Sequence, residues 1–245
     1  MTKQWTAIKG QDVVLPDLAA LDREQLESML ADAYQINECY RVLKKGGSNI
    51  VAEVLRGNDF YEYDHYPDGD VYDDETCSQY YYHAHRGLPG ENGHFHTFVR
   101  RAGIPKGISP VPYDGETPWP TGDDVLCHFV AVSMDVYGFP IGLFATNRWV
   151  TDENWYRADD LEQVLDGFEI DHAVPSWPTN LWLSSMLRLF RPQVSALLRH
   201  RDQIVDAWAK AHPDKDVYED RDLEVTGWLR ISVDQQMSQV RELLA

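Results

Sequence analysis

Two His-x-His pairs, separated by a short segment rich in turn-forming residues, constrain the fold of this chain more than any other feature. The pairs are His83 with His85 and His94 with His96. Side chains alternate between the two faces of a β-strand, so each pair places both imidazoles on one face. Residues 86–93 contain three glycines, a proline and an asparagine, which favour a reverse turn. The pattern predicts a β-hairpin with four histidines on one face.

One register of this hairpin brings all four rings together, with His85 opposite His94 and His83 opposite His96. Directly opposite residues in an antiparallel pair have Cβ atoms about 5 Å apart. Residues i and i+2 on one strand are about 6.5–7 Å apart. Several ring nitrogens can converge on one ion at this spacing. We therefore predict that these four histidines are metal ligands.

The amino-acid composition limits the kinds of binding partner and the cellular compartment that we expect for this chain. The chain has 245 residues, of which 43% are hydrophobic, and its formal net charge is −18. This charge repels nucleic-acid phosphates and anionic lipids. No apolar run approaches the roughly 18–20 residues that span a bilayer, and the first residues lack the apolar segment of a signal peptide. Cys39, Cys77 and Cys127 form neither a disulfide framework nor a Cys-x-x-Cys pair. We expect a reduced cytoplasmic protein without nucleic-acid or membrane partners.

Hydrophobic periodicity divides the chain into three zones of one predicted domain, 1–245. Residues 17–46 carry apolar side chains at helical spacing, with Asp22 or Asp17 as N-cap and two glycines as a stop. The zone 49–150 predicts antiparallel strands, and 158–245 is mainly helical. The candidate strands of the middle zone are 49–55, 79–85, 94–101, 125–135 and 141–149. The acidic stretch 64–75 and the proline-rich stretch 103–124 are predicted loops.

The third zone is expected to contain helices over 158–167, 180–211 and 234–244. Pro192 should divide or kink the longest of these. A further strand is possible over 223–233. Together the zones predict an α+β fold in which an antiparallel sheet of about five or more strands is flanked by N-terminal and C-terminal helices.

Four other residues are candidates for the site around the histidines. On the predicted hairpin, Tyr81 and Arg100 share the histidine face, and either could orient a substrate. Glu91 is the nearest carboxylate in the turn and could fold over the site. His128 begins a later strand, and consecutive strands often pair, so it could serve as an extra ligand or an acid–base group.

The all-histidine donor set predicts one transition metal ion, with Fe, Zn, Cu and Mn left open. Structural zinc sites usually recruit cysteines, and no cysteine pair lies near, which favours an open functional site. We expect a metal-dependent enzyme with a small-molecule substrate, and a homo-oligomer is compatible with the sequence. Redox or oxygen chemistry is favoured over hydrolysis because no dedicated general-base carboxylate stands beside the cluster.

Three alternatives stay open at this point. The chain could be a non-catalytic metal-binding or metal-sensing protein. It could be an interaction module in which the histidines form a structural hydrogen-bond network. The four close imidazoles could also respond to protons near pH 6–7 without any metal.

The sequence resembles two known groups of proteins. His83, His85, a later Glu91 and a later-strand His128 resemble the metal arrangement of cupins, which implies that the three histidines are ligands. Glu91 follows later than in cupins, however, and the second histidine pair is foreign to them. Separately, Tyr82-His-Ala-His-Arg86, Gly93-His-Phe-His-Thr97 and Asn147-Arg-Trp149 resemble an uncharacterised bacterial domain family of unknown function, mainly over residues 75–155. That resemblance implies a soluble bacterial protein and no particular activity.

Overall fold

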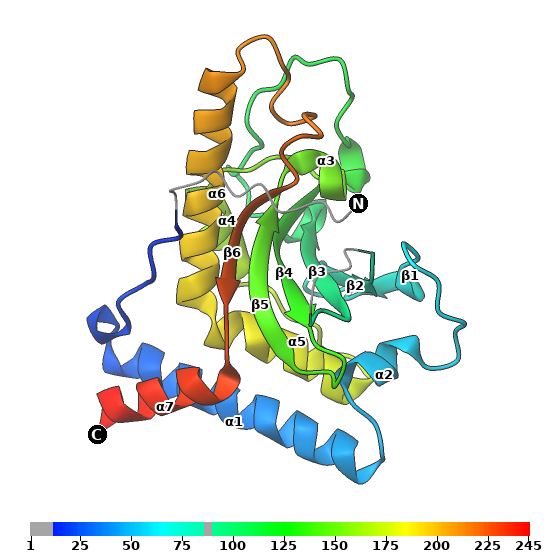
Figure 1. Ribbon diagram of the computed structural model, residues 1–245, viewed down its shortest axis with the longest axis vertical. Helices are drawn as coiled ribbons and strands as arrows, with labels where there is room; N and C mark the ends of the chain where they lie inside the picture. The colour runs from blue at the N-terminus through cyan, green and yellow to red at the C-terminus, as the bar shows by residue number, and fades with distance from the viewer. Residues whose placement is uncertain (1–11, 86–89) are drawn as a thin grey trace.

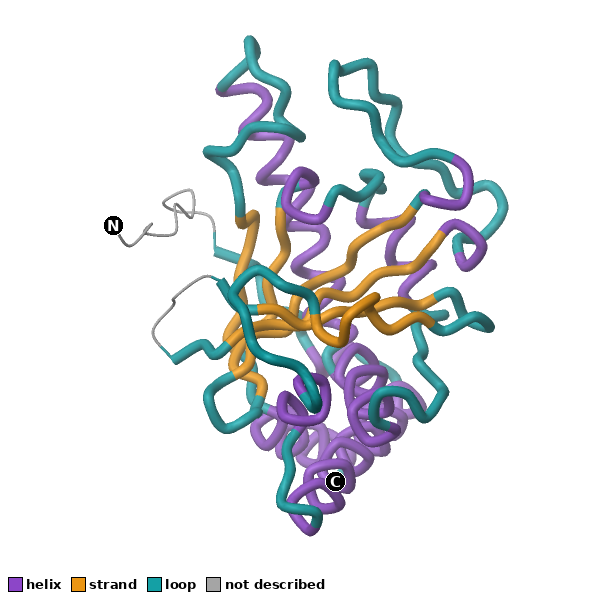
Figure 2. The backbone as a smooth tube through the Cα atoms, turned by 90° about the vertical axis from the view of Figure 1, so that its right-hand side faces the viewer, coloured by secondary structure: helices purple, strands orange, loops and turns teal. Residues whose placement is uncertain are grey.

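The computed structural model describes residues 12–85 and 90–245, and within them it has the predicted α+β architecture (Figure 1). Six antiparallel strands form one sheet in the order β1-β2-β3-β4-β5-β6, so every strand pairs with its neighbour in sequence. In Figure 2 the strands form one curved layer, and a large group of helices packs on one side of it together with the C-terminus. The strands are β1 (Tyr66–Tyr72), β2 (Ser78–His83), β3 (Gly93–Arg100), β4 (Leu126–Met134), β5 (Pro140–Thr146) and β6 (Val225–Arg230).

The helices come from both ends of the chain and from a long insertion between β5 and β6. In the parts of the chain that the structure describes, no helix is both long and apolar enough to cross a membrane. The helices are α1 (Arg23–Lys45), α2 (Ile50–Leu55), α3 (Arg148–Thr151), α4 (Ala158–Leu165), α5 (Trp177–Leu189), α6 (Arg191–Ala211) and α7 (Val233–Leu244), with short 3-10 turns at Leu18–Ala20, Arg101–Gly103 and Gly122–Asp124.

Helix α1 begins and ends at residues that the sequence indicated. The Asp22 side chain accepts a hydrogen bond from the backbone N–H of Gln25 (2.8 Å), and the Gln25 side chain accepts one from the backbone of Asp22 (3.0 Å). This capping box satisfies two N–H groups that have no partner within the helix. Asp17 caps the preceding 3-10 turn instead. The helix stops before Gly46, and Gly47 has the left-handed φ of 73° that glycine adopts without strain.

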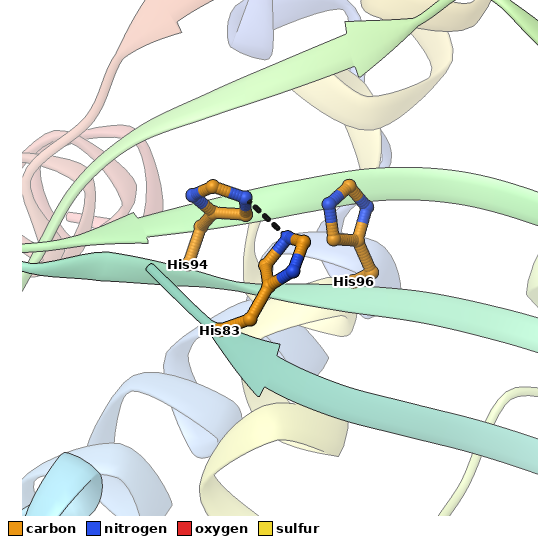
Figure 3. A group of neighbouring side chains, drawn as sticks. All are labelled: His83, His94 and His96. Atoms are coloured by element: carbon orange, nitrogen blue, oxygen red, sulfur yellow. Dashed lines mark hydrogen bonds between the residues drawn. The ribbon is translucent and has the colours of Figure 1, made fainter. Parts of the chain in front are cut away.

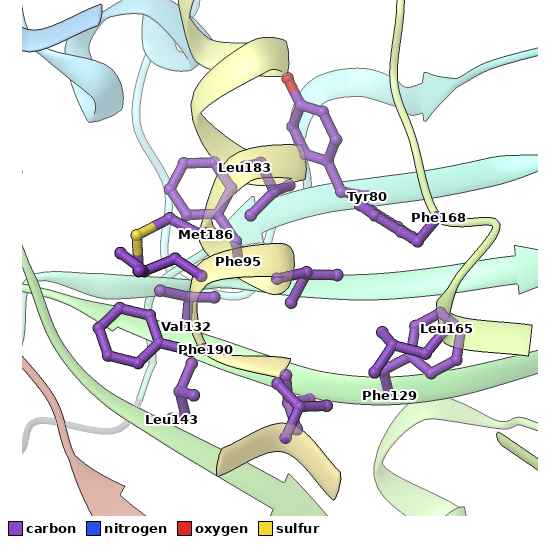
Figure 4. Packing of buried hydrophobic residues seen from close by; sticks show 14 of the residues in the cluster. Tyr80, Phe95, Phe129, Val132, Leu143, Leu165, Phe168, Leu183, Met186 and Phe190 are labelled. Atoms are coloured by element: carbon purple, nitrogen blue, oxygen red, sulfur yellow. The ribbon is translucent and has the colours of Figure 1, made fainter. Parts of the chain in front are cut away.

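One face of the sheet forms the hydrophobic core. Figure 4 shows helix α5 crossing this face, with its buried side chains against those of the strands. Alternation along each strand sends every second residue to this side, so the aromatic and branched residues gather here. The residues in contact at this interface include Tyr80, Phe95, Phe129, Val132 and Leu143 from the sheet and Leu183, Met186 and Phe190 from the helical side.

Two predicted elements are wrong. The predicted strand 49–55 is instead helix α2 with its N-cap Asn49, whose side chain accepts a hydrogen bond from the backbone N–H of Ala52 (2.9 Å) and starts a helical turn. A short apolar run fits either structure until such a cap is recognised. The stretch 64–75 is not a loop but contains β1. This strand is the edge of the sheet, where acidic residues can face solvent, and a bulge between Tyr66 and Val71 interrupts its pairing.

The other predicted elements are confirmed, with shifted ends. Strands β2 to β5 correspond to the four remaining candidates, and β6 lies within 223–233. The predicted helix over 180–211 is divided as expected: α5 ends at Leu189, and Pro192 lies in the first turn of α6. Proline is tolerated there because the first N–H groups of a helix have no intrahelical acceptor.

A buried hydrogen bond ties α5 to the sheet and gives a test of this packing. The Tyr80 hydroxyl donates to Oδ1 of Asn180 (2.6 Å), and both residues are fully buried. Tyr80→Phe would leave that oxygen without its donor, so we expect a loss of about 1–3 kcal/mol in the free energy of unfolding. Urea denaturation measures it, with the exposed Tyr137→Phe as control. Equal stability of the two variants would show that this bond does not hold the helix.

Candidate metal centre

The two His-x-His pairs meet across strands β2 and β3, but in a different register from the predicted one. His83 lies opposite His94, and Tyr81 lies opposite His96. The predicted pairing of His85 with His94 and of His83 with His96 is therefore wrong by two residues. Strand β2 ends at His83, so the connection to β3 is longer than the sequence suggested. A shift of two residues preserves which face each side chain occupies, so His83, His94 and His96 still share one face.

Three of the histidines form a compact group. His83, His94 and His96 each offer a ring nitrogen, and these three atoms lie within 4.8 Å of one another. His94 and His96 are 1% exposed and His83 is 9% exposed. Figure 3 shows the three rings on the same side of the two strands, with His83 and His94 adjacent and His96 beside them. These residues could hold a metal ion.

The distance between two of these nitrogens suits a small cation. The Nε2 atoms of His83 and His94 are 2.8 Å apart. Two nitrogens that bind one ion at a typical distance of about 2.05 Å stand about 2.9 Å apart at a right angle and about 3.3 Å apart at a tetrahedral angle. The pair therefore already matches a right-angled arrangement, and a shift of about 0.5 Å gives a tetrahedral one.

In His94 and His96, Nδ1 contacts a neighbouring side chain. His94 Nδ1 lies 3.2 Å from Oε1 of Glu91, and the Ser133 hydroxyl donates to the same oxygen at 2.8 Å. The Glu91 side chain is only 4% exposed. His96 Nδ1 lies 3.0 Å from Nε2 of His128. Contacts of this kind fix the orientation of a ligating imidazole and direct its Nε2 inward.

The predicted neighbours of the cluster take different positions. The ring of Tyr81 lies 5.1 Å, centre to centre, from the rings of His83 and His96, and burial raises the pKa of its phenol. Arg100 shares the face but donates to Gln79 on β2. His85 lies beyond the end of β2, half-buried and outside the group of three. Its ring is still 4.6 Å from that of His83.

His65 is a site neighbour that the sequence reasoning missed. Its ring stacks on Tyr81 with centroids 3.6 Å apart, and it meets the ring of His83 at 5.6 Å. Its Nδ1 lies 3.1 Å from Oδ1 of Asp70. The residue lies in the acidic stretch 64–75. The sequence could not predict that His65 lies near the cluster, because no regular spacing connects it to the two His-x-His pairs.

The buried residues His128, next to His96, and Glu153 lie where ionised side chains are disfavoured. Burial, together with a smaller effect of the nearby Arg201, lowers the pKa of His128 to about 3, so the imidazole is neutral near pH 7. The backbone N–H of His128 donates to Oε2 of Glu153 at 2.7 Å. Glu153 is fully buried, and this raises its pKa to about 7 against the opposing effect of Arg201.

Comparison with known proteins places the chain in a family. Residues 30–231 match the model of a domain of unknown function, DUF6969. The chain belongs to this family. No curated protein and no solved structure matches it. The resemblance to an uncharacterised domain family is thus confirmed, over more of the chain than the motifs that indicated it. A link to cupins is not shown, and the description of DUF6969 assigns no activity to the family.

The buried carboxyl of Glu153 predicts a pH dependence of stability. Its pKa is about 7 in the folded chain and about 4.5 in the unfolded chain. The folded state therefore retains a proton that the unfolded state loses, and this contribution to stability falls as the pH rises from about 4.5 to 7. The slope is at most about 1.4 kcal/mol per pH unit.

Glu153→Gln removes this titration and keeps an acceptor for the His128 N–H. Relative to the unmodified chain, the variant should gain about 1–3 kcal/mol in the free energy of unfolding between pH 5 and pH 7.5. Denaturant titrations at both pH values measure the difference. The exposed Glu116→Gln serves as control. A Glu153→Gln difference that does not change with pH would contradict the raised pKa.

Proposed function

We propose that this DUF6969 chain is a metal-dependent enzyme whose centre binds one transition metal ion through Nε2 of His83, His94 and His96. The observation that carries the proposal is the convergence of three buried ring nitrogens within 4.8 Å. A hydrogen bond between two histidines accounts for one pair of rings, whereas a shared ion accounts for three ring nitrogens that lie this close together. The outer contacts of Glu91 and His128 support it, because ligating histidines usually have such partners.

The donor set narrows the choice of ion and of substrate. Imidazole suits Fe, Zn and Cu, and Mn remains compatible. Three protein ligands leave coordination positions for a substrate. Three neutral imidazoles do not compensate a divalent charge, and the nearest carboxylate, Glu91, stands one shell further out. The centre would therefore carry a net positive charge, which favours a small anionic substrate.

The residues around the centre favour redox or oxygen chemistry over hydrolysis. A hydrolytic site needs a general base beside the attacking water. Glu91 Oε1 is already shared by His94 and Ser133, which suits an orienting role better than proton transfer. Tyr81, with its raised pKa, stays protonated and could donate a hydrogen bond to a substrate. Arg100 would act only through Gln79, and His128 by positioning His96.

A structural histidine network is the second candidate, favoured by one distance. The 2.8 Å between Nε2 of His83 and Nε2 of His94 is itself a hydrogen-bond distance, and it requires no metal. In that case the cluster would stabilise the fold of a non-catalytic module. A metal sensor would instead bind the ion and offer it no open position.

Metal content separates these candidates. Protein purified without a polyhistidine tag, loaded with Zn²⁺ or Fe²⁺ and dialysed, should retain about one equivalent by elemental analysis. His94→Ala and His96→Ala should lose it, because each removes one of three ligands. His172→Ala and His212→Ala, at partly exposed histidines outside the cluster, should retain it. If the metal-free protein has the same melting temperature with and without added metal, the structural histidine network is supported instead.

The orienting role of Glu91 makes a second prediction. Glu91→Gln keeps the size of the side chain but replaces the carboxylate that contacts His94. We expect a 10- to 100-fold weaker affinity for Zn²⁺, measured by competition with a chromophoric chelator. Ser133→Ala should have a smaller effect in the same direction, and the exposed Glu116→Gln none. Unchanged affinity in Glu91→Gln would mean that the carboxylate does not support a ligand.

A further inference from the structure

We propose that His65 is a substrate-binding residue at the mouth of the centre, where its Nε2 accepts a hydrogen bond from an N–H or O–H of the substrate. This inference rests on the proposed function, because it requires a ligand bound to the metal ion beside His83. It assigns a role to a residue that lies outside the two histidine pairs and comes from a different strand region.

His65 is more exposed than the histidines of the cluster that it contacts. Its side chain is 44% exposed, whereas His94 and His96 are almost completely buried. Its ring lies flat on Tyr81, with an angle of 9° between the planes, and Tyr81 in turn contacts the rings of His83 and His96. His65 also meets His83 directly, nearly at a right angle. A ligand that enters toward His83 would therefore pass beside this ring.

A chain of hydrogen bonds across three strands fixes the orientation of His65. Arg100 on β3 donates to Gln79 on β2, and Nε2 of Gln79 donates to Oδ2 of Asp70 on β1 at 2.6 Å. The other carboxylate oxygen of Asp70 lies 3.1 Å from His65 Nδ1. Asp70 has a left-handed φ of 60° within the bulged part of β1. Unusual backbone of this kind is held in place by its surroundings and is common at functional sites.

The carboxylate determines what the exposed nitrogen can do. Asp70 accepts a hydrogen bond from Nδ1, so the neutral ring carries its proton there and its Nε2 is an acceptor. Among the residues that the structure describes, Nε2 of His65 makes no hydrogen bond. A substrate group that binds Nε2 of this tautomer is therefore a donor. Combined with a positively charged centre, this selects a small anion that has a metal-binding oxygen and a neighbouring N–H or O–H.

Two probe anions test the inference on Co²⁺-loaded protein, whose visible spectrum reports ligand binding. Acetohydroxamate carries a metal-binding oxygen and an N–H, whereas azide carries no hydrogen. His65→Ala should bind acetohydroxamate about tenfold more weakly and azide within twofold, with cobalt still at one equivalent. His65→Gln, which retains an acceptor, should recover part of the loss. His172→Ala is the matched histidine control.

The outcomes separate the two proposals. If His65→Ala binds cobalt fully and acetohydroxamate as well as the unmodified chain does, the role of His65 is wrong and the metal centre stands. If His65→Ala weakens the binding of acetohydroxamate and of azide equally, His65 does not act as a hydrogen-bond acceptor for the substrate. Asp70→Asn should resemble His65→Ala, because the amide no longer selects the tautomer. If the unmodified chain binds no cobalt, the proposed function itself fails.

Discussion

The pairing of β2 with β3 is the constraint on which the rest of the structure depends. In this ladder Tyr82 lies opposite Phe95, and His83 lies opposite His94. Alternation sends the first pair into the core beneath α5 and the second pair to the opposite face. The large aromatic side chains fix the register through packing, and the same register fixes the histidines. Core stability and the geometry of the candidate centre are therefore set by one interaction.

Burial gives the histidine face its chemical character. Near-complete exclusion from water disfavours charged imidazoles, as the lowered pKa of His128 illustrates. Neutral imidazoles are the form that binds metals. The carboxylate of Glu91 stands one shell out, where it can orient His94 without occupying a coordination position. Neutral imidazoles in this arrangement could bind the metal ion that we propose, and the half-exposed His65 would then contact its ligand.

The local features of the fold could be read from residues that carry their own physical signal. The Asp22 cap, the division at Pro192 and the aromatic strands around the histidines are determined by side-chain chemistry over a few residues. The sequence wrongly predicted a strand where helix α2 lies and a loop where strand β1 lies, because a short segment can fit more than one periodic pattern. Asn49 acts as a cap only when its side chain turns back on the chain, and β1 is a strand only because β2 offers it an edge.

The sequence by itself determined that His83, His94 and His96 would share one face of a hairpin, because alternation in a strand is a property of the backbone. Only the tertiary structure decided which of them converge. The end of β2 at His83 left His85 outside the group, and the register brought Glu91, Ser133 and His128 around His94 and His96. His65, the residue before β1, joined them through stacking and a carboxylate contact. These are contacts between distant segments, and packing rather than local spacing sets them.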